Sequence, residues 1–153
     1  MEQKVEVKNS VISTIFGVST REIEEKNELK NLFADGISLV YQFRNRTAHG
    51  GRVYNFTTYR EYIRFNTIFH SKSCISNKLY RFGYGKNDLY TFIKFFSFMP
   101  KDLNEKLNIG VRSILKEYLS KYPEDKNMLL TEIGVPPTII EFDLEEIFYI
   151  TLY

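Results

Sequence analysis

Hydrophobic residues recur every three or four positions through most of the chain, the spacing of one buried face on an α-helix. The first clear stretch follows Ser19, which with Glu22 forms the capping-box pattern of a helix start. Asp35-Gly36 interrupts the stretch, so the pattern predicts two helices, over residues 20–34 and 36–49. A pair of glycines directly after residue 49 predicts a firm end to the second helix.

The second half of the chain has the more regular helical pattern. Asp88 precedes a short apolar helix that ends before Pro100, a longer helix ends at Pro123, and a short helix precedes Gly134. The apolar positions that mark the longer helix are Leu103, Leu107, Val111, Ile114, Leu115, Tyr118, Leu119 and Tyr122.

Two parts of the chain allow more than one interpretation. Thr58 and Glu61 repeat the capping-box pattern and predict a helix near residues 58–70, whereas the alternation over residues 53–56 equally suits a short extended segment. The glycines between residues 80 and 85 predict a loop. The tail over residues 138–153 is a strand or a docked extension, because it holds an apolar run: Ile147, Phe148, Tyr149 and Ile150.

These elements predict an all-α bundle of four to six helices, with an irregular aromatic-rich region and an extended C-terminal tail, folded as one domain over residues 1–153. A composition of 43% hydrophobic and 26% charged residues is that of a globular protein. The lone Cys74 excludes an intramolecular disulfide. Because polar residues interrupt every apolar run near the N-terminus, and no run reaches about 20 residues, we expect a cytoplasmic protein without membrane association.

The charges are unevenly distributed although the net charge is only +2. Residues 1–40 hold five Lys or Arg against seven Asp or Glu, and residues 87–153 hold seven against eleven. Residues 41–86 hold nine against one, which makes this middle third +8, and they also contain eleven of the 24 aromatic residues. Phosphates bind such cations and bases stack on exposed rings, so the window predicts an anionic partner such as single-stranded RNA. The alternative is that the rings are core and the arginines a solvated face.

The segment from Arg44 to Asn55 is the strongest candidate for chemistry. His49 can take a proton from a ribose 2′-hydroxyl or protonate a leaving oxygen, and the Arg44 guanidinium can hold phosphoryl oxygens as charge develops. Asn45 lies four residues before His49 and shares its helix face, whereas Arg44 is rotated from His49 by about 140°. For the Arg44 guanidinium to come close to the His49 imidazole, the helix end must fray, the long Arg44 side chain must reach around the helix, or a second copy of the site must face the first. In the alternative reading, Asn45 caps the helix, Arg44 pairs with Asp35 or Glu25, and His49 satisfies the helix dipole.

The string Arg44-Asn45-Arg46-Thr47-Ala48-His49 resembles the Arg-Asn-x-x-x-His motif of HEPN domains, and the run on to Arg52, Tyr54 and Asn55 is similar to the bacterial abortive-infection (Abi-like) branch. Later segments follow in the same order, at Asp88-Leu89-Tyr90, Leu115 to Pro123 and Ile133 to Pro136, so the resemblance spans about residues 10–137. Abi-like members commonly carry a second histidine where this chain has Gly50, and a tryptophan where it has Tyr54.

The resemblance implies a HEPN-like helical bundle that pairs as a homodimer, with both motifs in a shared cationic cleft. It implies a metal-independent endoribonuclease of the toxin or phage-defence type, with an antitoxin protein as a further candidate partner. Arg44 and His49 would be catalytic and Asn45 supportive. The resemblance and the positive charge of residues 41–86, here called the cationic window, together predict the residues that contact RNA: Arg46, Arg52, Tyr54, Asn55, Arg60 and Arg64. The alternative is a non-catalytic HEPN module that binds RNA or a protein partner.

A metal or cofactor is not expected. His70 and Cys74 lie close in sequence, but a zinc site needs four ligands and the chain has only two histidines and one cysteine. Cys74 as a nucleophile with His70 as its base lacks a third, orienting group, which favours an unreactive thiol.

Overall fold

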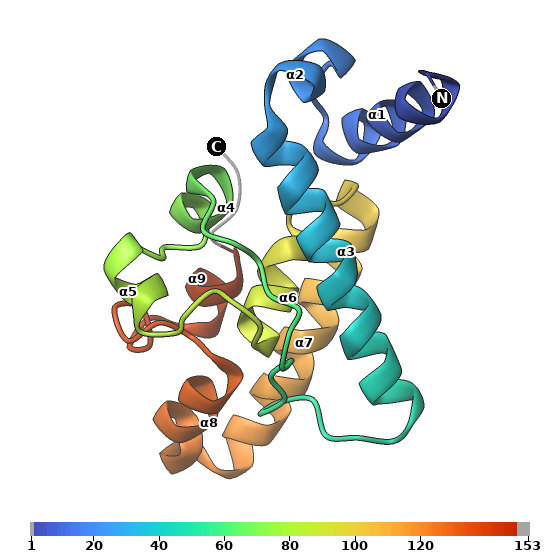
Figure 1. Ribbon diagram of the computed structural model, residues 1–153. Coiled ribbons are helices and arrows are strands. Elements are labelled where there is room, and N and C mark those ends of the chain that lie inside the picture. The colour runs from blue at the N-terminus through green and yellow to red at the C-terminus, as the bar shows by residue number, and fades with distance from the viewer. Residues whose placement is uncertain (1, 150–153) are drawn as a thin grey trace.

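The structure, a computed structural model, describes residues 2–149, and every regular element within this range is a helix (Figure 1). The described helices are α1 (Glu2–Phe16), α2 (Thr20–Glu25), α3 (Asn27–Ala48), α4 (Thr67–Lys72), α5 (Asn77–Arg81), α6 (Leu89–Phe96), α7 (Lys101–Lys121), the 3₁₀ turn η1 (Pro123–Asp125), α8 (Lys126–Ile133) and α9 (Leu144–Tyr149). The all-α class is confirmed. The expected four to six helices are too few, because α2, α4, α5 and α9 have only five or six residues and cannot repeat a hydrophobic pattern.

Helix α6 is the centre of the structure, packed between α3 and α7 (Figure 1). On one side, Tyr90 and Ile93 join a core cluster with residues of α7, α8 and α9. On the other side, Phe95 joins a second cluster with Leu39 and Phe43 of α3. The short helix can serve both clusters because nearly all its side chains are apolar, and Asp88 fixes its start by accepting hydrogen bonds from Thr91 N and Oγ1, both at 2.7 Å. Burial raises the pKa of Asp88 to about 6.

Gly36 lies inside α3 at the point where α6 comes closest. A Cβ at this position would overlap the ring of Phe95, which is fully buried. The predicted break at Asp35-Gly36 is therefore wrong: the glycine leaves room for Phe95, and α3 continues for 22 residues. The break falls at Lys26, after the short α2. The Ser19 capping box is confirmed, since the Ser19 hydroxyl accepts from Glu22 N at 3.2 Å and Ser19 N donates to Glu22 Oε2 at 3.1 Å.

Residues 52–66, here called the strap, have no helix and cross from the end of α3 to α4 (Figure 1). The helix predicted over residues 58–70 is wrong except for Thr67–Lys72. Thr58 does not cap a helix, because its hydroxyl donates to the Glu61 carbonyl and its backbone N–H donates to Asn87 O at 3.3 Å. The helix start is set instead by Asn66, whose Oδ1 accepts from Phe69 N at 3.1 Å. The loop expected from residue 80 begins after Arg81, because α5 reaches that residue.

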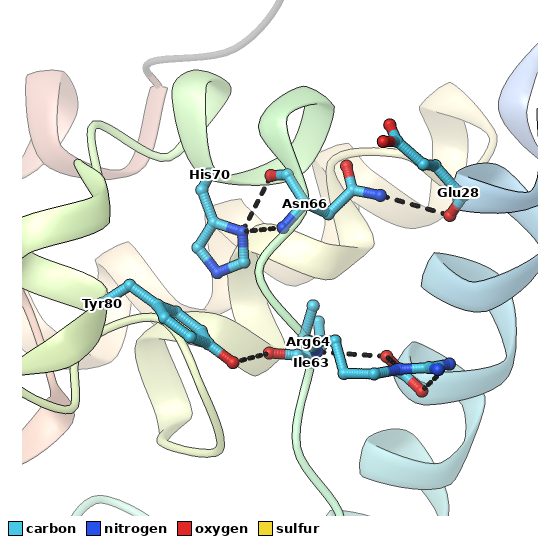
Figure 2. A network of polar contacts seen from close by, with 7 residues as sticks. Glu28, Ile63, Arg64, Asn66, His70 and Tyr80 are labelled. Carbon is cyan, nitrogen blue, oxygen red and sulfur yellow. Dashed lines mark hydrogen bonds and ion pairs between the residues drawn. The ribbon is translucent and has the colours of Figure 1, made fainter.

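A buried polar network fastens the strap to the helices around it (Figure 2). The His70 ring is fully buried; its Nδ1 lies 3.0 Å from Asn66 N and 2.9 Å from Asn66 O, and its Nε2 lies 2.9 Å from Gly85 O. A neutral ring with its proton on Nε2 donates to Gly85 O and accepts from Asn66 N. Burial lowers the pKa of His70. Asn66 Nδ2 donates to Glu28 O of α3 at 3.2 Å. His70 is thus a structural residue that holds α4, the strap and the Gly85 turn together.

The C-terminal segment differs from the extended tail that the sequence predicted. Residues Leu144–Tyr149 form α9, and Ile147 and Phe148 are buried against the core, so docking is confirmed and a strand is wrong. Glu145 of α9 forms ion pairs with Arg112 and Lys116 of α7. Ile150, which belongs to the same apolar run, lies outside the described residues.

Helix α7 packs on the core through only part of the apolar face that its pattern predicted, at Val111, Leu115 and Leu119. The buried residues of α7 are Asn104, Asn108 and Leu115, whereas Ile114 is 70% exposed. The buried Asn108 Nδ2 donates to Asn104 O at 3.0 Å, whereas Asn108 Oδ1 has no hydrogen-bond partner among the described residues. Within residues 2–149, no helix has both the length and the hydropathy that crossing a membrane requires.

We predict that Gly36→Ala lowers the free energy of unfolding by about 1–3 kcal/mol, because the new methyl group forces the buried Phe95 ring out of its position. Gly110→Ala is the matched control: Gly110 also lies inside a helix, but nothing lies near its added Cβ. This control should gain about 0.5–1 kcal/mol from helix propensity. Urea denaturation of both variants measures the difference, and equal effects at the two sites would contradict the close approach of α3 and α6.

We predict that wild-type protein loses stability relative to His70→Gln as the pH falls below about 6.5. The folded-state pKa of His70 is lowered, so the neutral ring stabilises the fold above the unfolded-state pKa, and this contribution is lost on acidification, with a limiting slope of about 1.4 kcal/mol per pH unit. Urea denaturation between pH 8 and 5 measures it. Subtracting one curve from the other cancels the contribution of Asp88, which titrates in the same range. A constant difference between wild type and His70→Gln over this pH range would contradict the prediction.

Candidate functional site

The candidate site lies at the C-terminal end of α3. His49 is the residue that follows the last helical turn, and its N–H donates to Asn45 O at 3.1 Å. Gly50 then takes the left-handed conformation (φ +68°), and its N–H donates to Thr47 O at 3.0 Å. The predicted helix stop is confirmed. The turn leaves the His49 imidazole exposed, without a hydrogen bond to any other described residue.

Asn45 connects Arg44 to the face of α3 on which His49 lies. An ideal helix separates Arg44 from His49 by about 140°. The Arg44 guanidinium nevertheless turns toward this face, because its Nη1 donates to Asn45 Oδ1 at 3.1 Å. Asn45 therefore accepts from Arg44 through its side chain and from the His49 backbone through its carbonyl. The Arg44 side chain thus bends toward Asn45, while the two groups expected to act together, the Arg44 guanidinium and the His49 imidazole, make no direct hydrogen bond within residues 2–149.

The alternative ion pairs for Arg44 do not form. Asp35 pairs instead with Arg64, through Oδ2–Nε and Oδ1–Nη2 distances of 2.9 Å each. Glu25 pairs with Arg21 at 2.9 Å. Arg44 has no carboxylate partner among the described residues, so its charge remains available to an anionic ligand.

Arg46 lies on the opposite side of α3, about 160° from Arg44. Its Nε donates to Arg52 O at 3.1 Å, and its guanidinium lies 5.3 Å from the centre of the Phe56 ring. Gly51 packs directly against this side chain. The contacts of Arg46 thus fold the start of the strap back onto the helix.

The remaining predicted RNA-binding residues are spread along the strap. Arg52, Asn55 and Arg60 are exposed, and Tyr54 is half-buried against the core. Arg64 lies beside Asp35, which is 14 residues before His49 and so about 21 Å away along the helix axis. Arg44, Asn45 and His49 therefore lie at one end of α3, with a side-chain contact between Arg44 and Asn45, and Arg64 lies outside this group.

The cations of residues 41–86 have few carboxylate partners among the described residues. Of the nine Lys and Arg side chains in this cationic window, Arg64 alone forms an ion pair with a described carboxylate. The aromatic rings of residues 41–86 are partly core and partly available for stacking, so each interpretation of the sequence holds for some of them. Phe43 and Phe69 are in the core, whereas the exposed rings are Tyr41, Tyr59, Tyr62, Phe65 and Phe82. This end of the protein and the strap thus combine uncompensated positive charge with exposed rings.

The sequence analysis missed an apolar groove beside Arg44, between α3 and α6. It has a volume of about 320 Å³, and Val40, Phe43, Arg44 and Thr47 of α3 form one wall. Their spacing of three, four and seven residues puts them on one helix face and was the available signal. Phe92 and Phe96 of α6 form the facing wall. We refer to this site as the α3–α6 groove.

Other chemistry considered for the sequence has less support from the geometry. Both ring nitrogens of His70 are used by backbone groups, so it does not act as a base for Cys74. Cys74 is half-buried and has a φ of +58°. Among the residues that the structure describes, no group of three His, Cys, Asp or Glu side chains could hold a metal ion.

The sequence matches no protein-family model, and neither a curated protein nor a solved structure is significantly similar to the chain.

Proposed function

We propose that the protein is a metal-independent endoribonuclease of the HEPN type, with His49 and Arg44 as catalytic residues and Asn45 as the residue that positions Arg44. The observation that carries the proposal is the presence, in the last two turns of one helix, of an exposed imidazole and of a guanidinium without a carboxylate partner among the described residues. The uncompensated cations of residues 41–86 support an RNA substrate, because they attract a phosphate backbone.

The proposed reaction is attack of a ribose 2′-oxygen on the neighbouring phosphorus. An imidazole takes the 2′-hydroxyl proton as the new O–P bond forms, and the bond from phosphorus to the 5′-oxygen breaks as that oxygen gains a proton from an imidazolium. Arg44 stabilises the negative charge that develops on the non-bridging oxygens. The products are a 2′,3′-cyclic phosphate and a 5′-hydroxyl, and the reaction requires ribose.

The geometry of this reaction favours a homodimer with a composite site. The attacking and leaving oxygens lie on opposite sides of phosphorus in an in-line displacement. One imidazole on a helix end reaches one side, so a second His49 from a second copy would serve the other. The exposed face of α3 offers a surface for that copy, because Ile37 is 41% and Tyr41 60% exposed, two turns and one turn before Asn45.

One observation favours the alternative, an RNA-binding module that does not cut. A catalytic histidine is normally oriented by a partner on its other ring nitrogen. The His49 imidazole has no such hydrogen bond to another described residue. In the endoribonuclease proposal, this orienting group comes from the RNA or from the second copy.

We predict that His49→Ala and Arg44→Ala each reduce RNA cleavage by about 100-fold or more, since one removes the general base and the other the stabiliser of transition-state charge. Cleavage of a labelled single-stranded RNA, with and without a chelator, measures this. The chelator should have no effect, a DNA strand of the same sequence should survive, and the product ends should carry cyclic phosphate.

The matched control is Arg21→Ala, which removes an exposed arginine from α2, far along the chain from the motif. It should cleave like wild type. If the His49 and Arg44 variants also cleave like wild type, the catalytic assignment is wrong. If wild type binds RNA in a salt-sensitive manner without cutting it, the binding module is the correct reading.

We predict that the protein is a dimer in solution and that Tyr41→Lys shifts it to a monomer, because the change puts a charge into the apolar part of the α3 face. Size-exclusion chromatography with light scattering measures the mass. Ile114→Lys is the matched control, since Ile114 is an even more exposed apolar residue on α7. Dissociation by Ile114→Lys and not by Tyr41→Lys would assign the interface to α7 and contradict the α3 face.

A further inference from the structure

The α3–α6 groove is walled by aromatic rings and has almost no polar surface of its own. Phe43 and Phe92 stack with ring centres 4.7 Å apart, and Phe96 lies 5.0 Å from Phe92. Phe96 is half-buried, so part of this side chain is exposed. The volume of about 320 Å³ is at the lower end of the range of small-molecule sites. A flat, single ring system fits such a site better than a peptide helix does.

The polar groups at the groove are already used. Thr47 Oγ1 lies 2.7 Å from Phe43 O and 3.0 Å from Arg44 O, and it donates its proton to these carbonyls. The Arg44 Nη1 group donates to Asn45 at the edge of the groove. A ligand in the groove therefore finds stacking surface inside and one positive charge at the rim.

We propose that the α3–α6 groove binds an unpaired nucleobase of the RNA strand, next to the phosphate held by Arg44. This inference rests on the proposed function. Arg44 belongs to both sites, so a phosphate on its guanidinium brings the adjoining nucleotide to the mouth of the groove. Nucleobases stack on aromatic side chains, and a strand of RNA supplies the base and the negative charge together.

The chemistry of the groove defines the preference it imposes. Apart from the Arg44 guanidinium at its rim, the walls of the groove are almost wholly apolar, so the groove does not read the hydrogen-bonding edge of the base. It selects by stacking area, so purines bind better than pyrimidines, and adenine and guanine bind alike. The preference for a base is therefore independent of phosphate binding, because phosphate binding depends on the cations and on the salt concentration.

The test measures binding of 2′-O-methylated eight-nucleotide RNAs, which cannot form the 2′-oxyanion, to the full chain by fluorescence anisotropy. The probes are an adenine octamer, a uracil octamer and an abasic octamer of the same charge. Wild type should bind the adenine octamer about 5- to 100-fold more tightly than the abasic one, with uracil between them. Phe96→Leu, which keeps apolar bulk but removes the ring, should reduce this preference while the salt dependence stays unchanged.

Phe82→Ala is the matched control, because Phe82 is an exposed ring at the end of α5 that does not line the groove. It should keep the wild-type preference. Equal preference in wild type and Phe96→Leu overturns the nucleobase site while leaving the proposed function intact. A change in molecular mass caused by Phe96→Leu assigns the groove to a second copy and also overturns it. Absence of salt-sensitive binding to all three octamers overturns both the groove inference and the RNA-directed function.

Discussion

The contact between the Phe95 ring and the backbone of Gly36 is the constraint on which the rest of the structure depends. The contact permits α6 to approach α3 without an intervening side chain. The almost wholly apolar helix α6 can therefore lie at the centre of the folded structure. The α3–α6 groove lies two turns further along, where Phe43, Thr47 and Phe96 replace the glycine contact and the helices no longer pack tightly. The position of Gly36 in α3 thus explains why α3 and α6 pack closely at one point and leave a groove two turns further along.

The strap is held by polar contacts because it contributes few buried apolar side chains. Its ends are fixed by Arg46 at the end of α3 and by Asn66 at the start of α4. Between them, Ile63 is buried, its N–H donates to Lys86 O at 2.9 Å, and its carbonyl accepts from Tyr80 Oη at 3.2 Å (Figure 2). A buried polar network of this kind specifies one arrangement, since each broken hydrogen bond leaves an unsatisfied buried group. The cations of the strap are therefore carried on irregular but well-anchored backbone.

The sequence predicts the elements better than it predicts their contacts. The same capping-box pattern starts a helix at Ser19 but not at Thr58, where a hydrogen bond from Asn87, 29 residues away, overrides the local signal. The local sequence at Gly36 predicts a helix break, whereas in the structure the glycine lies inside α3 and leaves room for the Phe95 ring. The helical period of α7 is visible in its sequence, whereas the burial of Asn104 depends on neighbours that no local pattern contains. Helix α1 gave little signal, since Val5, Val7 and Val11 are exposed and Ile12 is its only fully buried residue in the described part.

The candidate site was found because its residues are close in sequence and lie at one helix end. Arg44, Asn45 and His49 lie within the last two turns of α3, so their placement at one helix end follows from the sequence, although the helix rotates Arg44 about 140° from His49. The role of Arg64 could not be read in the same way, because its pairing with Asp35 depends on the path of the strap. A helix C-terminus also attracts cations by about 0.3–1 kcal/mol, and the glycine turn ends the helix without covering it. These two effects gather positive side chains where the chain turns away, which leaves them accessible to a phosphate. An imidazole displayed in this way lacks an orienting partner of its own, and that is the physical reason why its chemistry would depend on the bound strand or on a second subunit.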